Sequence, residues 1–190
     1  MCIIFPTVSK IEIDLARASR LLQPGPIALV TAKHKNKANV MVAAWVTNVS
    51  NDPPMVALAV HPARFTHDLI QKSGQFALNI PPRPRAEQVK KIGEVSGADI
   101  DKFVLTKLNL YEAKQVNAPL IVECIGHLEC GVVDTIRAGN HILFLAEIVA
   151  ASADELAFDG ERWTLADESV KPLHHLGGNW YAMLEGTISV

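Results

Sequence analysis

The stretch AAWVTNVSNDPPMVALAV, residues 43–60, places a polar break between two apolar runs and closes that break with consecutive prolines. Proline cannot donate to a strand ladder, so the pattern predicts a strand that ends before the next one begins. Main-chain groups freed at such an end, together with short polar side chains, can face the edge of a planar heterocycle. The alternative is a plain strand that ends in an Asx turn. The candidate residues are Thr47, Asn48, Val49 and Ser50.

Further short apolar runs, separated by turn residues, occur along the chain, a spacing typical of a barrel or sandwich. Most are apolar on both faces, which suits strands closed around a core and covered outside by helices or a partner subunit. The expected strands are Ile27–Ala32, Val40–Val49, Met55–Val60, Phe76–Ile80, a span from about Leu120 to Arg137, and Ile142–Ala151.

Helix signals between these runs are short. Thr66 is predicted to cap a helix over 67–72 that stops at Gly74, and Pro84 to start one over 85–92 that ends at Gly93. A third helical turn is expected near Asp101. A doubly wound parallel sheet needs longer, regularly alternating helices, and neither GxGxxG nor GxxxxGK[ST] occurs, so nucleotide binding by those loops is excluded as a first hypothesis.

The composition favours one domain spanning residues 1–190, since 190 residues with 49% hydrophobic and 20% charged content can bury one sizeable core. The formal net charge of -2 provides no basic field for nucleic acid or anionic lipid. We therefore expect neither a nucleic-acid nor a membrane partner.

The N-terminus lacks a positive n-region, and Pro6 interrupts its short apolar run, so we expect a cytoplasmic protein. No apolar run approaches the length of a transmembrane helix. The three cysteines, Cys2, Cys124 and Cys130, are an odd number without an export signal, which predicts reduced thiols.

The segment ARFTH, residues 63–67, brings a guanidinium, a hydroxyl and an imidazole to a predicted helix start. Helix N-terminal amides favour anions, and Arg64 and Thr66 can add hydrogen bonds to a phosphate. An ordinary capped helix with a solvated arginine explains the segment equally well. Asn79, at the end of another strand, is either a binding group or a turn former.

A metal site at Cys124, His127 and Cys130 is disfavoured. On a strand, positions 124 and 130 share one face while 127 points to the other, so the three ligands cannot readily converge. His174 and His175 are adjacent and point apart in the same way. We expect no metal.

In this order, the segments PGPIALVTA, AAWVTNVSNDPPMVALAV, ARFTHDLIQKSGQFALNIP, SGADIDKF, APLIVECIGHLEC, GNHILFLAEIV and PLHHLGGNWY resemble the flavin reductase-like family, which includes flavoredoxin and NAD(P)H:flavin or ferric reductases. The resemblance covers nearly the whole chain. It implies a mainly β fold, an antiparallel six-stranded Greek-key split β-barrel with short flanking helices, which is usually a homodimer with FMN near the subunit interface.

The resemblance also implies roles for residues. Thr47, Asn48, Val49 and Ser50 would line the isoalloxazine and ribityl chain, Arg64, Thr66 and His67 would hold the phosphate, Asn79 would lie close by, and Lys102 would be a second cationic contact. His141, in a Gly-Asn-His turn, would contact the nicotinamide of NAD(P)H. Asn140 and Ala146 depart from the family pattern there and weaken the case for NAD(P)H as the direct donor.

The expected function is an FMN-binding oxidoreductase, an enzyme that passes electrons from NAD(P)H through FMN to a flavin, a ferric complex, a quinone or a protein acceptor, with the chemistry carried by the cofactor. The alternative is a non-catalytic FMN-binding electron carrier similar to flavoredoxin. A third reading is a split-barrel relative that holds pyridoxal phosphate or haem.

Overall fold

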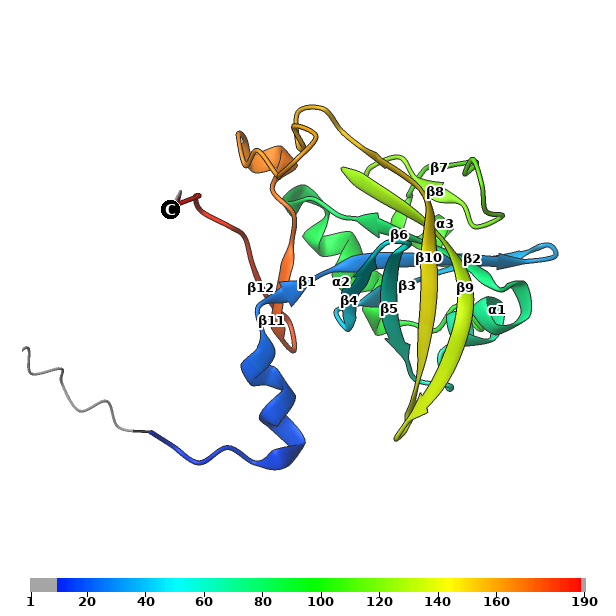
Figure 1. Cartoon of the computed structure of the whole chain (residues 1–190), viewed down its shortest axis with the longest axis horizontal. Helices are drawn as coiled ribbons and strands as arrows, with labels where there is room; N and C mark the ends of the chain where they lie inside the picture. Colours follow the sequence, from blue (N-terminus) through cyan, green and yellow to red (C-terminus); the bar gives the residue numbers. More distant parts are fainter. Residues whose placement is uncertain (1–9, 189–190) are drawn as a thin grey trace, which may run out of the picture.

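A computed structural model describes residues 10–188 of the chain (Figure 1); the expectations for the extreme N-terminus and Cys2 fall outside these residues. The body is one seven-stranded sheet in the order β3-β2-β6-β9-β10-β5-β4, with every neighbouring pair antiparallel. Its strands are β2 (Ala28–His34), β3 (Lys37–Ala43), β4 (Val46–Asn51), β5 (Pro54–Val60), β6 (Gln75–Ile80), β9 (Gly126–Ala138) and β10 (His141–Ala153). The fold is mainly β with a few helices, as predicted.

The prediction of six strands was wrong in detail. The expected strand Val40–Val49 is two strands, since β3 ends at Ala43 and β4 begins at Val46. The expected span from Leu120 to Arg137 likewise divides into β8 (Leu120–Ile121) and β9. Because β3 and β4 form the two edges of the sheet, its hydrogen-bonded ladder does not close into a barrel.

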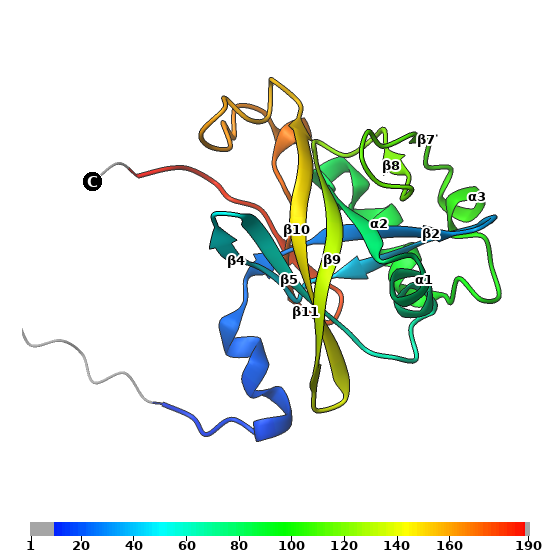
Figure 2. The same cartoon turned by 45° about the vertical axis from the view of Figure 1, so that its right-hand side comes forward.

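Three short helices lie on one side of the long β9–β10 hairpin (Figure 2). They are α1 (Phe65–Ser73), α2 (Ala86–Glu94) and α3 (Lys102–Thr106). Gly74 ends α1 in the left-handed conformation, with φ of 67°, and α3 begins directly after Asp101; both positions agree with the predictions. Asp101 caps α3 by accepting from two backbone amides. Arg64, not Thr66, is the N-cap of α1, and α2 continues through Gly93 to Glu94.

The core has two main parts. One lies among β2, β5, β6 and β10 and contains Leu58, Phe76 and Phe144, all essentially inaccessible. The other packs α2, through Val89 and Ile92, against Leu29 of β2 and neighbouring residues. Burying these side chains fixes α2 over the sheet, which sets one wall of the site described below.

Smaller elements complete the chain. A three-stranded sheet is formed by β1 (Gly25–Pro26), β11 (His174–Gly177) and β12 (Trp180–Ala182), and β7 (Leu110–Tyr111) pairs with β8. The 3₁₀ segments are η1 (Leu15–Leu22), η2 (Arg83–Arg85) and η3 (Glu168–Val170); η1 projects from the body (Figure 1). Among residues 10–188, no helix has the length and apolar character to cross a bilayer.

Candidate functional site

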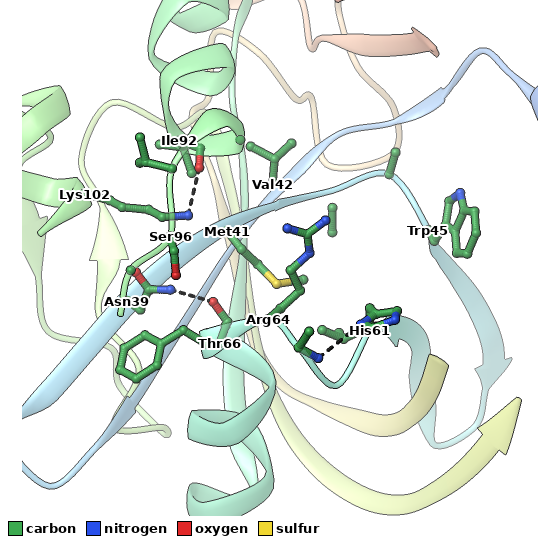
Figure 3. Close-up of a pocket in the computed structure, with 18 of the residues that line it drawn as sticks. Asn39, Met41, Val42, Trp45, His61, Arg64, Thr66, Ile92, Ser96 and Lys102 are labelled. Atoms are coloured by element: carbon green, nitrogen blue, oxygen red, sulfur yellow. Dashed lines mark hydrogen bonds between the residues drawn. The ribbon is translucent and has the colours of Figure 1, made fainter. Parts of the chain in front are cut away.

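A pocket of about 620 Å³ opens where the end of β3, the β5–α1 connection and the C-terminal end of α2 meet (Figure 3). A cavity of this size is typical of cofactor and small-molecule sites. We divide its lining into a polar end, comprising Asn39, Arg64, Thr66, Ser96, Gly97 and Lys102, and an aromatic end, comprising Trp45, His61 and His141. Arg64 lies between Lys102 and Trp45 in Figure 3.

The polar end is built by close packing of three segments. The Asn39 amide on β3 donates to the Thr66 hydroxyl on α1 at 2.8 Å. Gly97 lies against the same amide so closely that a Cβ at this position would overlap it. A side chain at 97 would therefore push the Ser96–Gly97 turn away from β3 and widen this end of the pocket.

Lys102 carries a positive charge into this packed end. Its side chain is 6% exposed, and its ammonium donates to the Ile92 carbonyl at 2.8 Å, at the end of α2. Burial, and then the positive charge of Arg64, lower the pKa of Lys102 to about 8. Within residues 10–188, neither Lys102 nor Arg64 forms an ion pair with a carboxylate. The two cations are thus available to an anion.

The start of α1 adds backbone donors beside Arg64. This residue makes no side-chain capping hydrogen bond, so its side chain leaves the first amides of the nine-residue helix uncapped. The helix dipole places partial positive charge at the same point. Guanidinium, ammonium, hydroxyl and amide donors together form a group suited to a phosphate.

The aromatic end gathers three rings from three separate elements. The His141 ring, at the start of β10, lies with its centroid 4.8 Å from that of Trp45 and 5.3 Å from that of His61. Trp45 is half exposed, so part of its indole remains accessible. Burial, followed by the charges of His61 and Arg64, lowers the pKa of His141.

The pocket brings together four of the residues singled out from the sequence: Arg64, Thr66, Lys102 and His141. Thr47, Asn48, Val49 and Ser50 do not line it, because they lie on the exposed edge strand β4, just beyond the chain turn at Trp45.

His67 and Asn79 also lie outside the pocket lining. The His67 ring packs against Phe144, with 5.4 Å between centroids, on the core side of α1. The Asn79 amide donates to the Leu29 carbonyl at 2.8 Å and its oxygen accepts from the Ile121 amide at 2.9 Å. These contacts hold β2 and β8 against β6, and both ends of the Asn79 amide are used within the fold.

The sequence reasoning missed much of the lining. Residues 41–45 supply one wall, and Asn39 and His61 contribute polar groups. Ser96, which also lines the pocket, lies in the segment SGADIDKF that carried the family resemblance. The available signal was the pair of small residues Ala43-Ala44, which permits the chain to leave β3 and a ligand to approach its backbone. The continuous apolar run through Val49 concealed that break.

Comparisons with known proteins agree with this architecture. Residues 20–178 match the flavin reductase like domain. The chain is 34% identical over 175 residues to the uncharacterized protein YddH of Escherichia coli, a match that covers 90% of this chain and 93% of that protein. Its structure resembles that of flavoredoxin from Methanosarcina acetivorans, with 29% identity, a TM-score of 0.84 and coverage of 96% and 95% of the two chains. It also resembles an FMN-binding domain of a flavin reductases-like enzyme from Shewanella baltica, with 27% identity, a TM-score of 0.80 and coverage of 94% and 95%. The chain belongs to the flavin reductase-like family.

Proposed function

We propose that this protein is an FMN-binding oxidoreductase that passes electrons from NAD(P)H through FMN to a flavin, a ferric complex or another acceptor. The observation that carries this proposal is one pocket with two cations at one end, neither paired with a carboxylate of residues 10–188, and aromatic rings at the other end. The family relationship and the FMN-binding structural neighbours support it.

The polar end fits the phosphate of FMN. Arg64 can donate a pair of hydrogen bonds, Lys102 supplies a second positive charge, and the hydroxyls of Thr66 and Ser96 complete the donor set. A phosphate dianion there would also relieve the repulsion that Arg64 exerts on Lys102.

The wall formed by residues 41–45 fits the planar part of the cofactor. Val42 and Met41 present apolar surface, while the chain between β3 and β4 offers main-chain donors and acceptors. We assign the isoalloxazine to this wall in place of Thr47–Ser50, and we assign no cofactor contact to His67 or Asn79.

When bound, FMN supplies the hydride and single-electron chemistry that no amino-acid side chain provides. The residues at the polar end would hold the phosphate, and the wall formed by residues 41–45 would orient the ring. His141 lines the aromatic end and is the residue we assign to the nicotinamide side.

A second candidate is an FMN-binding electron carrier without turnover of its own. The likeness to a flavoredoxin favours it, as do Asn140 and Ala146, which depart from the family pattern around His141.

We further propose that the protein is a homodimer. Exposed apolar side chains occur on the neighbouring strands β9 and β10 and on the edge strand β4: Val133, Ile136, Val149 and Val49. Covering them with a second copy would remove this surface from water. Light scattering should give twice the mass of the chain, and a monomer at micromolar concentration would contradict the dimer.

A visible absorption spectrum, recorded before and after anaerobic addition of NADH or NADPH, tests the function. Flavin bands that bleach on addition are the expected result. Bands that persist would favour the carrier, and purified protein that neither carries nor binds added FMN would overturn both proposals.

A further inference from the structure

The aromatic end contains groups that flavin binding alone does not use. Trp45 and His61 lie together on the side of the pocket opposite Lys102 (Figure 3). His61 follows β5, whereas the phosphate-binding groups that we assign lie on α1 and beyond α2. A ligand that reaches His61 must therefore occupy space beyond the polar end.

A backbone hydrogen bond fixes the tautomer of neutral His61. The Ala63 amide donates to His61 Nδ1 at 3.1 Å, so this nitrogen is an acceptor and the ring proton lies on Nε2. Among the hydrogen bonds of residues 10–188, the His61 ring takes part in this one through Nδ1 and in none through Nε2. His61 therefore presents one N–H donor beside the pocket.

In neutral His141 the proton lies on the other ring nitrogen, Nδ1. Its Nδ1 lies 2.7 Å from the side-chain oxygen of Asn140, and because an amide oxygen only accepts, Nδ1 carries the proton. In the neutral ring Nε2 is then the free basic nitrogen. The charged or titratable groups that act on His141 are His61 and Arg64, both of which oppose its protonation when positively charged.

An anion that contacts Nε2 of both His61 and His141 would satisfy the free nitrogen of each imidazole. It would accept from His61 Nε2–H and would favour protonation of His141 Nε2, which then becomes a second donor. The only acidic residue among the described lining residues is Glu94, which lies on α2. The accessible part of the Trp45 indole adds a surface on which a flat ring can stack.

From this geometry we infer that the ligand bound beside the flavin, whether electron donor or acceptor, carries an anionic oxygen group, carboxylate or phosphate, next to a planar ring. The anion binds between His61 and His141, and the ring stacks on Trp45. This inference rests on the proposed function, in which FMN occupies the remainder of the pocket. It makes His61 a residue that selects substrates by charge.

Nicotinate and nicotinamide are matched probes, because they share one ring and differ in charge. Protein is first loaded with FMN, and loading is verified by its absorption bands. Each probe is then titrated by flavin difference spectroscopy and by calorimetry. We expect nicotinate to bind at least about tenfold more tightly, the consequence of one charge-assisted hydrogen bond. Nicotinamide mononucleotide carries a phosphate in place of the carboxylate, so its affinity relative to that of nicotinate shows which of the two anionic groups the site prefers.

Two variants assign the preference to His61. In His61→Asn the side-chain oxygen can still accept from the Ala63 amide, but the donor at Nε2 is lost. This variant should retain FMN and lose the preference for nicotinate. The control His34→Asn changes a histidine in the β2–β3 hairpin, outside the pocket, and should retain both.

Proton uptake supplies a second readout. Calorimetry at pH 7 in two buffers of different ionisation enthalpy should show net proton uptake with nicotinate, and His141→Gln should abolish it. Equal affinity for nicotinate and nicotinamide, or an unchanged preference in His61→Asn, would overturn the inference and leave FMN binding intact. Failure to load FMN would instead overturn the proposed function, and the inference with it.

Discussion

Two polar clusters in this protein differ in which groups satisfy their hydrogen bonds and charges. In the first, which we call the loop clamp and define as Asn79 and Glu129, the chain itself supplies the partners. The Glu129 carboxylate, 3% exposed, accepts from three consecutive amides, those of Lys114, Gln115 and Val116, at 3.0, 2.6 and 3.2 Å.

The polar end of the pocket, in contrast, has cationic groups that the chain does not neutralise. Lys102 donates to one carbonyl, and neither it nor Arg64 has a carboxylate partner in the described part of the chain. The loop clamp is therefore a structural device, whereas the polar end is arranged for a ligand. The predictions below separate stability from binding on this basis.

Glu129→Ala should give the largest effect. Three amides would lose their acceptor, one of them buried and two part-buried, and the free energy of unfolding should fall by about 3 kcal/mol. Urea denaturation measures the loss of unfolding free energy. The folded Glu129→Ala variant should still bind FMN with wild-type affinity. Glu123→Ala is the matched control: its carboxylate accepts from Asn109 in a solvent-exposed setting, so we expect a loss below about 1 kcal/mol. Equal losses would mean that the loop clamp has no special role.

Arg64→Ala should act on binding and leave folding intact. Loss of a hydrogen bond to a charged phosphate should weaken FMN by about 1.5 to 3 kcal/mol, or roughly 10- to 150-fold. Quenching of flavin fluorescence measures the dissociation constant. Arg162→Ala removes an exposed guanidinium far from the pocket lining and should have no effect. An unchanged constant in Arg64→Ala would remove this residue from the phosphate site.

The pH dependence of FMN affinity should report Lys102. Without ligand its pKa is about 8, so the ammonium loses its proton as the pH rises past this value. A bound phosphate favours the charged form and raises the pKa, so binding above pH 8 requires proton uptake and becomes weaker as the pH rises. We expect affinity to fall about tenfold between pH 7 and pH 9.

The variant Lys102→Met tests the source of this dependence. It should bind FMN more weakly at pH 7 and show little further loss up to pH 9. A wild-type decline that persists in Lys102→Met would assign the titration to another group.

The smallest effects are expected on β4. Thr47→Val and Asn48→Ala change side chains that lie outside the pocket lining, so FMN affinity should stay within about 0.5 kcal/mol of wild type. A loss near that of Arg64→Ala in either variant would return the cofactor to the site first expected from the sequence.

Part of the fold could be predicted from the sequence. Alternating turns and apolar runs predicted the antiparallel β architecture, and Gly74 and Asp101 marked a helix end and a helix start correctly. These signals are local, because they depend on backbone conformation and on hydrogen bonds within a few residues.

The site depended on contacts that are not local. Asn79 resembled a binding group in sequence, and only the approach of Leu29 and Ile121, 50 and 42 residues away, shows that its amide is already used. His61 and His141 carry no joint signal, since they meet only because β5 and β10 are neighbours in the sheet. The break at Ala44-Trp45 was hidden because both flanking strands are apolar.

The most direct test of the central claim compares FMN with riboflavin, which has the same ring and lacks the phosphate. We predict that the wild-type protein binds FMN at least about tenfold more tightly than riboflavin, since charge-assisted hydrogen bonds to the phosphate are the main anchor. In Arg64→Ala this difference should shrink. Equal affinity for the two flavins, or no affinity for either, would contradict the assignment of the pocket.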